Sequence, residues 1–352
     1  LPKLIIILSK KYEKSKYFPY FLRKILMVII MGHEIDLKNY EIRTDLVLDT
    51  IENNEMNIKT DTYNDGKVKV TKVNVDEDSS KILNKKPGNY ITIEFDDVTD
   101  TENKNKVEVI FVNELKEMIY SLGIKEDDTV LVIGLGNAKS TPDSLGPKVI
   151  ENILVTRHLF ILDEDVSSGV REVSAMSPGV MASTGIETVD IVTSIVDKIK
   201  PSLLLIIDAL AASTIGRINK SIQITDTGIH PGSGVGNMRK EISSDTLGIP
   251  VIAIGIPTVV ESSTIVYDTI NYLFKHISYI KDNQNMNKLI VNRYNYLDKI
   301  KDKDLTMEEK KEMAGLLGQL SDTDKKNLIN EVLNALNYNF IVTPKEIDFV
   351  VD

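Results

Sequence analysis

Two short apolar runs, each leading to a carboxylate, constrain the fold of this chain more than any other feature. Residues 129–135 (TVLVIGL) carry no charge, and residues 203–209 (LLLIIDA) carry only Asp208. Such runs are typical of strands buried on both faces of a parallel sheet. The loop after the first run brings Asp143 just before a helical pattern. Because ligands of open α/β sheets bind at the carboxyl ends of the strands, we expect Asp143 and Asp208 to meet there and act as a pair.

Strand and helix patterns alternate from residue 129 to about residue 280. This alternation predicts an α/β fold with a mostly parallel, twisted sheet that helices cover on both faces. The expected strands are 129–135, 203–209, 220–225 and 250–255, and the expected helices are 146–154, 187–199 and 261–278. A Gly-, Ser- and Pro-rich stretch (167–185) and a glycine-rich loop (226–238) lie between them.

The segments on either side of this core have other patterns. Residues 67–75 (KVKVTKVNV) and 90–95 (YITIEF) alternate polar and apolar side chains, which predicts an antiparallel β edge region. A helix is expected over 107–122, with Gly123 as its stop. Helical patterns at 306–318 and 321–337, with Ser and Thr capping signals, predict a small C-terminal helical appendage within residues 283–352.

Composition excludes several classes of site. The net charge of −10 and the pI of about 5.1 argue against a surface for nucleic acid or an anionic membrane. The absence of Cys excludes disulfides, thiolate zinc sites and a cysteine nucleophile. Four His residues are too few for a multi-histidine metal site, so no metal and no cofactor are expected.

The first thirty residues differ from the rest of the chain. They begin without Met and alternate basic clusters with apolar runs too short to span a membrane. A signal peptide fits poorly, because no small-residue cleavage site follows an apolar core. We expect residues 1–30 to be a non-native upstream extension and Met31 to be the start, the alternative being a genuine amphipathic tail.

A close pair of carboxylates has a definite chemistry. Two such groups in a partly dry site share a proton, because ionising both is costly. The ionised member can take a proton from water while the protonated member donates to a carbonyl oxygen, as in aspartic proteases. The structural alternatives are that Asp143 only caps a helix and that Asp208 only bonds backbone at a strand end.

A second motif, Asp226-Thr227-Gly228, has the tripeptide of pepsin-like enzymes. In those enzymes the tripeptide occurs twice, in two similar lobes, and follows an apolar strand. Here it occurs once, after QIT. We therefore interpret Asp226 as a turn residue, the alternative being a catalytic role.

The loop that follows is dense in glycine. Its four glycines let backbone N–H groups approach a ligand, which fits either a phosphate or an extended peptide backbone. The loop lacks the GK[ST] ending of a P-loop. His230 in this loop is a candidate third active-site group, metal ligand or ordinary hydrogen-bonded residue. The predicted substrate-binding loop residues are Gly228, His230, Gly232, Gly234 and Gly236.

Several segments together resemble the germination protease family, endopeptidases that degrade small acid-soluble spore proteins when spores germinate. They include VIGLGNAKSTPDSLGP, SPGVMASTGIET, LLLIIDALAA, DTGIHPGSGVGNMRKEIS and LGIPVIAIGIPTVV. The resemblance covers about residues 34–352 and implies a phosphorylase/hydrolase-like fold. This family is classed among the atypical aspartic peptidases, and its two essential Asp residues correspond to Asp143 and Asp208.

The resemblance also implies a self-processing zymogen. The cut would fall between Asp45 and Leu46, so that residues 31–45 form a pro-segment, residues 46–282 the peptidase domain and residues 283–352 the appendage. The family implies a homotetramer, acid-soluble spore proteins as substrates, and a cytoplasmic location in the spore core. No nucleic-acid or membrane partner is expected.

Two alternatives stay open at this point. The chain is distantly similar to hydrogenase-maturation endopeptidases, which hold nickel with two carboxylates and a His. This likeness suggests a metal-assisted peptidase that uses Asp143, Asp208 and His230. The other alternative is a non-catalytic protein that binds acid-soluble spore proteins without cutting them.

Overall fold

One mixed sheet organises the larger of two compact units in the chain. The computed structural model describes residues 44–53, 58–96, 101–162, 166, 169–232, 240–282, 299–338 and 340–344. Among these, residues 44–306 and 340–344 belong to the larger unit, and residues 307–338 belong to the smaller one. The predictions for residues 1–43, which include the upstream extension and most of the pro-segment, lie outside the described residues.

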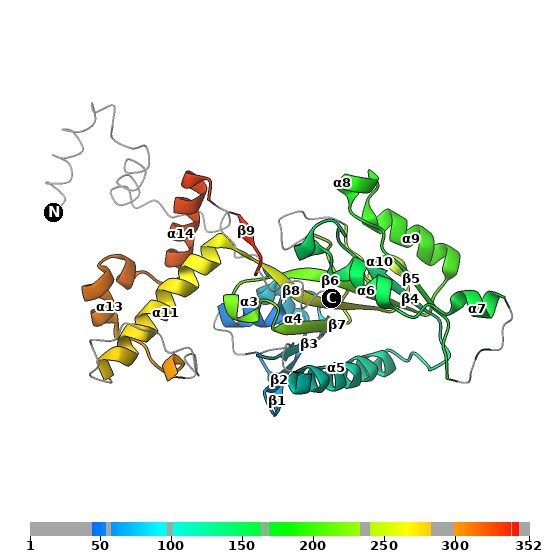
Figure 1. Ribbon diagram of the computed structural model, residues 1–352, viewed down its shortest axis with the longest axis horizontal. Coiled ribbons are helices and arrows are strands. Elements are labelled where there is room, and N and C mark those ends of the chain that lie inside the picture. The colour runs from blue at the N-terminus through cyan, green and yellow to red at the C-terminus, as the bar shows by residue number, and fades with distance from the viewer. Residues whose placement is uncertain are drawn as a thin grey trace. The chain divides into compact units, whose positions relative to one another are not determined.

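Nine strands of the described chain form the sheet in the order β1-β2-β3-β7-β8-β6-β4-β5, with β9 pairing with β8 (Figure 1). The strands are β1 (Thr60–Asp65), β2 (Val68–Val75), β3 (Gly88–Glu94), β4 (Val130–Gly134), β5 (Val173–Met176), β6 (Leu203–Ala212), β7 (Ser221–Thr225), β8 (Val251–Glu261) and β9 (Ile341–Val342). Strands β5, β4, β6 and β8 are parallel, whereas β7, β3, β2 and β1 follow in antiparallel pairs. The predicted parallel core and antiparallel edge are confirmed.

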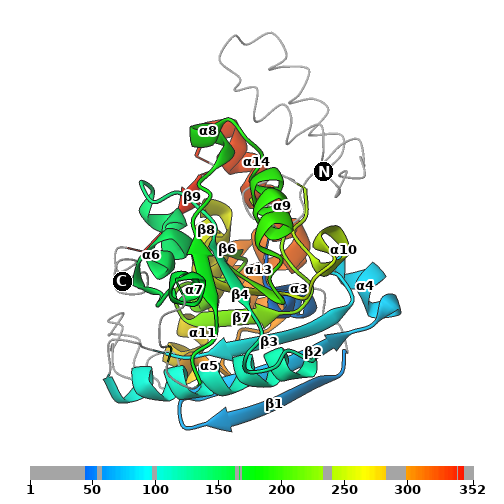
Figure 2. The ribbon, with the colours of Figure 1, turned by 90° about the vertical axis from the view of Figure 1, so that its right-hand side faces the viewer.

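Helices cover both faces of this sheet. In the larger unit they are α3 (Val47–Asn53), α4 (Glu77–Leu83), α5 (Thr101–Ser121), α6 (Leu145–Asn152), α7 (Arg157–Ile161), α8 (Met181–Thr184), α9 (Thr188–Ile199), α10 (Ser244–Leu247) and α11 (Ser262–Asp282). Figure 2 shows α5 running alongside the antiparallel strands β1, β2 and β3. Gly123, with φ +78°, follows α5 as the predicted stop.

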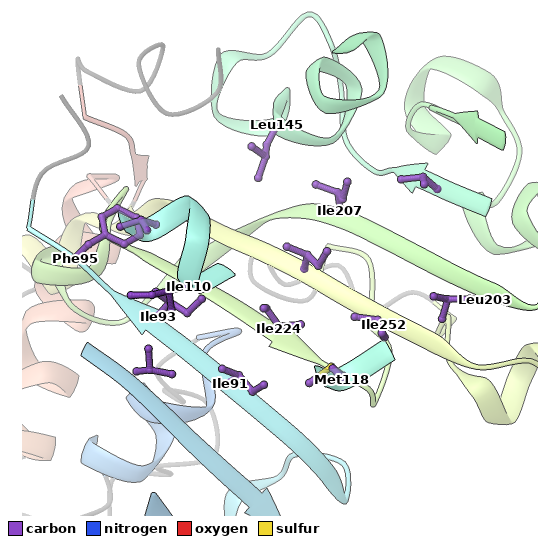
Figure 3. Packing of buried hydrophobic residues seen from close by; sticks show 14 of the residues in the cluster. Ile91, Ile93, Phe95, Ile110, Met118, Leu145, Leu203, Ile207, Ile224 and Ile252 are labelled. Atoms are coloured by element: carbon purple, nitrogen blue, oxygen red, sulfur yellow. The ribbon is translucent and has the colours of Figure 1, made fainter. Parts of the chain in front are cut away.

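Alternation along β6 divides the core into two layers, because successive strand residues point to opposite faces. Leu203 and Ile207 join the layer beneath α5 and α6, with Ile91 of β3, Ile224 of β7 and Ile252 of β8 (Figure 3). Leu204 and Ile206 join the layer beneath α9, which contributes Val189, Val192 and Val196. Asp208 continues the alternation of Leu204 and Ile206, so it lies on the α9 face. β6 does not end there, because it continues to Ala212, three residues beyond the predicted end.

The structure corrects several sequence-based boundaries. The Gly-, Ser- and Pro-rich stretch contains the edge strand β5 and the short helix α8. β8 continues to Glu261, six residues beyond the predicted end, so α11 starts at Ser262. The polar segment after Asp45 forms α3, because Val47, Leu48 and Ile51 turn one apolar face onto Val73, Val75 and Leu83.

The smaller unit holds the C-terminal helices α13 (Met307–Ala314) and α14 (Asp322–Leu336). α13 is shorter than the predicted 306–318 because Gly315, with φ +56°, ends it. Ser321 caps α14 as predicted, its hydroxyl oxygen accepting from the Asp324 amide at 3.1 Å.

Candidate active site

The loop after β4 holds Asp143 through close backbone packing. A Cβ on Gly134 would lie 2.1 Å from the Gly146 carbonyl oxygen, and a Cβ on Gly136 would lie 2.0 Å from that of Asp143. The amide of Asn137 donates to the Asp143 carbonyl at 2.8 Å. On the other side, Thr258 of β8 donates its hydroxyl to the Pro142 carbonyl at 2.6 Å. These contacts fix the 3-10 turn that carries Asp143 (Thr141–Asp143) beside β6 and β8.

Asp208 is the buried member of the predicted pair, only 7% exposed. Burial raises the pKa of its carboxyl well above the ordinary value, and the negative charges of Asp143 and then Asp45 raise this pKa further. A hydrogen bond from the Ala209 amide at 2.9 Å offsets part of this effect. Asp143 is only partly buried. Asp208 therefore lies within electrostatic range of two other carboxylates, Asp143 and Asp45, and it is more buried than Asp143.

Asp45, the third carboxylate, is held by the backbone of β6 just beyond Asp208. Its amide donates to the Ala211 carbonyl at 3.0 Å, and the Ala211 amide donates to its Oδ2 at 2.8 Å. The register of β6 against β8 shifts between Leu210 and Ala211, an irregularity of the kind that re-aims backbone groups next to active sites. The next residue, Leu46, is fully buried against Leu210, Ala212, Ile218 and Val260.

Two side chains donate to the carbonyl oxygen of Asp45. The Lys85 ammonium lies 3.2 Å from this oxygen and 2.9 Å from the Thr44 carbonyl. The Gln223 Nε2 lies 3.3 Å from the same oxygen. Gln223 also accepts from the Val47 amide through Oε1 at 2.8 Å. The peptide bond between Asp45 and Leu46 is thus held from both sides.

The residues after this bond are anchored by Arg217, which lies in the 3-10 turn η3 (Ile215–Arg217). Its guanidinium pairs with the fully buried Asp49, with Glu52 at 2.6 Å and with Glu94 at 3.1 Å. The other oxygen of Asp49 accepts from the Ser213 amide at 2.6 Å. Hydrogen bonds of this kind are strong because one partner is charged.

Asp226 occupies a structural position. Its two carboxylate oxygens accept from the backbone amide and from the side-chain amide of Asn89, at 2.8 and 2.7 Å. It therefore joins the end of β7 to the start of β3, as a turn residue does. In the loop that follows, Gly228 (φ +81°) has no room for a side chain, because a Cβ would lie 2.2 Å from the Ile242 carbonyl oxygen. Gly234 and Gly236 lie outside the described residues.

His230 is exposed, and its Nε2 lies 3.7 Å from an oxygen of Glu241. Among the residues that the structure describes, which include Asp143, Asp208 and His230, no group of three or more His, Cys, Asp or Glu side chains is placed to hold a metal ion. The donor set considered for nickel is therefore not assembled in this geometry. No helix within the described ranges has the length and apolar character needed to cross a bilayer.

Comparison with known proteins assigns this chain to a family. A model of the germination protease family matches residues 34–352. The chain belongs to the germination protease family. It is a peptidase by this membership.

Relatives of known identity agree with this assignment. The germination protease of Oceanobacillus iheyensis is 46% identical, over 89% of this chain and 91% of that protein. The germination protease of Bacillus thuringiensis subsp. konkukian is 44% identical, over 92% of each chain. Among solved structures, the NiFe hydrogenase maturation protease HycI from Thermococcus kodakarensis matches 37% of this chain and 74% of its own, with a TM-score of 0.25 and 18% identity.

Some residues around Asp45 were not predicted from the sequence. Lys85 stands in a polar turn between α4 and β3, where a lysine gives no signal. Gln223 carried a weak signal, since it is an uncharged polar residue inside the apolar strand β7. Ala211 contributes only backbone groups, so no side-chain pattern could have identified it.

Proposed function

We propose that this member of the germination protease family is an endopeptidase made as a zymogen, which cuts its own bond between Asp45 and Leu46 and then degrades small acid-soluble spore proteins in the spore core. Asp143 and Asp208 act as the acid–base pair. The observation that carries the proposal is the clustering of three carboxylates. Asp45, at the expected cut, lies close enough to Asp208 for its charge to raise the pKa of that carboxyl.

The unequal surroundings of the two carboxylates support separate roles. Burial keeps Asp208 protonated at a pH where an ordinary Asp is ionised, so Asp208 is the proton donor. Asp143, whose negative charge contributes to that shift, is the base that takes a proton from the attacking water. This assignment goes beyond the sequence, which leaves the two roles open.

The contacts of Asp45 support a preference for an acidic residue before the cut. The Ala211 amide donates to the Asp45 carboxylate, and the Ala211 carbonyl accepts from the Asp45 amide. An apolar side chain at this position would leave the Ala211 amide without its carboxylate partner. We expect a substrate residue to take the same place once the pro-segment has left.

The decisive experiment replaces each carboxylate by its amide. Asp143→Asn and Asp208→Asn are assayed for processing at Asp45 and for cleavage of a small acid-soluble spore protein. Loss of both activities in both variants, each with a cooperative unfolding transition that shows it to be folded, supports the carboxylate pair. Activity near the wild-type level in either variant refutes it. Binding of the spore protein without any cleavage by the wild-type chain would instead support a non-catalytic binder.

We also propose that the chain assembles into homotetramers, as the family resemblance implies. Sedimentation velocity of the full chain tests this independently of the mechanism. A single species of four times the chain mass is expected, and a monomer at working concentrations would exclude it.

A further inference from the structure

The carbonyl oxygen of Asp45 has an environment that the carboxylate pair does not explain. It accepts hydrogen bonds from Lys85 Nζ at 3.2 Å and from Gln223 Nε2 at 3.3 Å. These donors come from separate parts of the chain, the turn after α4 and the middle of β7. Two convergent donors on one carbonyl oxygen are the arrangement that stabilises the oxyanion of acyl transfer.

We propose that Lys85 and Gln223 bind the carbonyl oxygen of the bond to be cut and stabilise the negative charge that forms on it. The proposal rests on the proposed cleavage between Asp45 and Leu46, and it adds two catalytic residues to the Asp143 and Asp208 pair. Both residues contact a reacting atom directly.

The orientation of the Gln223 amide follows from its partners. The Val47 backbone can only donate, so the atom of Gln223 that faces it is the oxygen, at 2.8 Å. The amide nitrogen then faces the Asp45 carbonyl. Gln223 is 6% exposed, and β3 and β8 flank its strand. One rigidly held amide therefore spans the bond between Asp45 and Leu46 and contacts the chain on both sides of it.

The Lys85 ammonium is positioned by the turn that follows α4. Asn84 adopts a left-handed conformation (φ 51°) and ends the helix, so the chain reverses before Lys85. Lys85 Nζ then contacts two successive carbonyls, those of Thr44 and Asp45. Burial lowers the pKa of this ammonium, and the carboxylates of Asp45 and Asp49 oppose that effect. A desolvated cation interacts more strongly with a developing negative charge than one in water does.

Hydrolysis of the bond between Asp45 and Leu46 proceeds through these residues in two stages. The water oxygen bonds to the Asp45 carbonyl carbon while Asp143 takes a proton from the water. The electron pair of the carbonyl moves onto its oxygen, where the N–H groups of Lys85 and Gln223 hold it. This electron pair then returns to re-form the carbonyl as the bond to the Leu46 nitrogen breaks, and the nitrogen keeps the electrons of that bond and takes the proton of Asp208. Thr44 positions the leaving nitrogen, because its hydroxyl oxygen accepts from the Leu46 amide at 3.1 Å.

The test measures the first-order rate of processing at Asp45 in the full chain. Lys85→Met removes the cation at nearly equal volume, and Gln223→Glu keeps an acceptor for the Val47 amide but removes the donor. Lys86→Met is the matched control, because Lys86 lies in the same turn but pairs with Glu241 and Asp245. Lys85→Arg restores N–H donors, which a purely structural role in filling space would not require. Asp208→Asn is measured beside them, and its inactivity would show that cleavage depends on the carboxylate pair.

We expect Lys85→Met and Gln223→Glu each to slow processing by about 10²–10³-fold, the usual effect of losing one oxyanion donor. Lys85→Arg should recover most of the Lys85→Met loss, and Lys86→Met should process at the wild-type rate, with every variant folded under the assay conditions. Processing within twofold of wild type in Lys85→Met and Gln223→Glu, with Asp208→Asn inactive, overturns this inference and leaves the proposed function standing. If the wild-type chain does not cut after Asp45, the proposed function fails and this inference fails with it.

Discussion

Asp49 and Arg217 form a buried ion pair that joins the first turn of α3 to the turn after β6. Arg217 also contacts Glu52 and Glu94, so three carboxylates surround one guanidinium. Asp49 accepts from the Thr44 hydroxyl at 2.8 Å as well. The ion pair therefore anchors the chain on both sides of the bond between Asp45 and Leu46.

Replacing Arg217 by Met should reduce the stability of the larger unit. The substitution leaves Asp49 buried without its cation, and breaking one partner of a buried pair typically costs about 3–5 kcal/mol. Urea unfolding monitored by circular dichroism measures the change. As a control, Lys81→Met removes an exposed pair with Asp78, and its cost should be about 0–1 kcal/mol. Equal stability losses in the two variants would contradict the anchoring role.

Gly136→Ala should abolish most of the peptidase activity. Gly136 has φ +115°, and an added Cβ would lie 2.0 Å from the Asp143 carbonyl oxygen, so the loop must move. A shift of about 1 Å in a catalytic group can cost about 10²-fold in rate. Cleavage of a small acid-soluble spore protein measures this loss.

Gly123→Ala provides the control for this substitution. Gly123 also has a positive φ, +78°, but nothing lies within 4 Å of an added Cβ. The substitution should cost roughly 1–2 kcal/mol of stability through backbone strain alone and leave the cleavage rate unchanged. Similar rates for the Gly136 and Gly123 variants would show that packing against Asp143 is not what holds the loop.

The sequence was most informative where one physical signal dominates. Uninterrupted apolar runs predicted β4 and β6, although β6 continues past Asp208 to Ala212. The strand-end rule led to the choice of Asp143 and Asp208, and the charge of Asp143 does act on Asp208 in the fold. β5 was missed because Val173–Met176 is short and half-buried at the edge of the sheet, where neither an apolar run nor clear alternation develops. α3 was missed because its apolar face spans only two turns.

The environment of Asp45 could not have been predicted from the sequence. It depends on the Ala211 backbone, on Gln223 and on Lys85, which lie 166, 178 and 40 residues away along the chain. No local periodicity connects residues so far apart, and two of these contacts involve side chains of ordinary polar character. Only the tertiary packing of α3 and the turn after α4 against β6 and β7 brings them together.

The contribution of Asp208 to the free energy of unfolding should fall as the pH rises. Its pKa is raised in the folded state, so between the unfolded value near 3.8 and the raised folded value the native state binds more protons than the unfolded state. Stability is therefore highest below the unfolded pKa and is lost as the pH increases to the folded pKa. Each unit by which the folded pKa exceeds the unfolded pKa corresponds to about 1.4 kcal/mol of stability.

Asp208→Asn tests this linkage. The amide keeps an oxygen for the Ala209 amide but does not ionise, so the variant should be more stable than the wild type at pH 7. The difference should shrink as the pH is lowered through the range in which an ordinary Asp becomes protonated. Urea unfolding of both proteins across this range measures it. A variant that is less stable than the wild type at pH 7 would contradict the assignment of Asp208 as a buried, protonated carboxyl.

Asp226→Ala should lower stability while sparing catalysis. The substitution removes two hydrogen bonds to Asn89, each contributing about 0.5–1.5 kcal/mol, so we expect a loss of about 1–3 kcal/mol. The cleavage rate, measured below the unfolding transition, should stay within a few-fold of wild type. A rate loss as large as that of Asp208→Asn would instead place Asp226 in the catalytic machinery.

Metal removal should not change the rate of cleavage. Asp143, Asp208 and His230 are not gathered into a ligand group, and the exposed imidazole of His230 lies 3.7 Å from a carboxylate oxygen of Glu241. Two carboxylates without a third ligand form a weak site for a transition metal. Cleavage rates with a chelator, and then with added nickel, measure the dependence in the wild type and in His230→Ala. A rate that falls on chelation, recovers with nickel in the wild type and fails to recover in His230→Ala would establish the metal-assisted mechanism in place of the carboxylate pair.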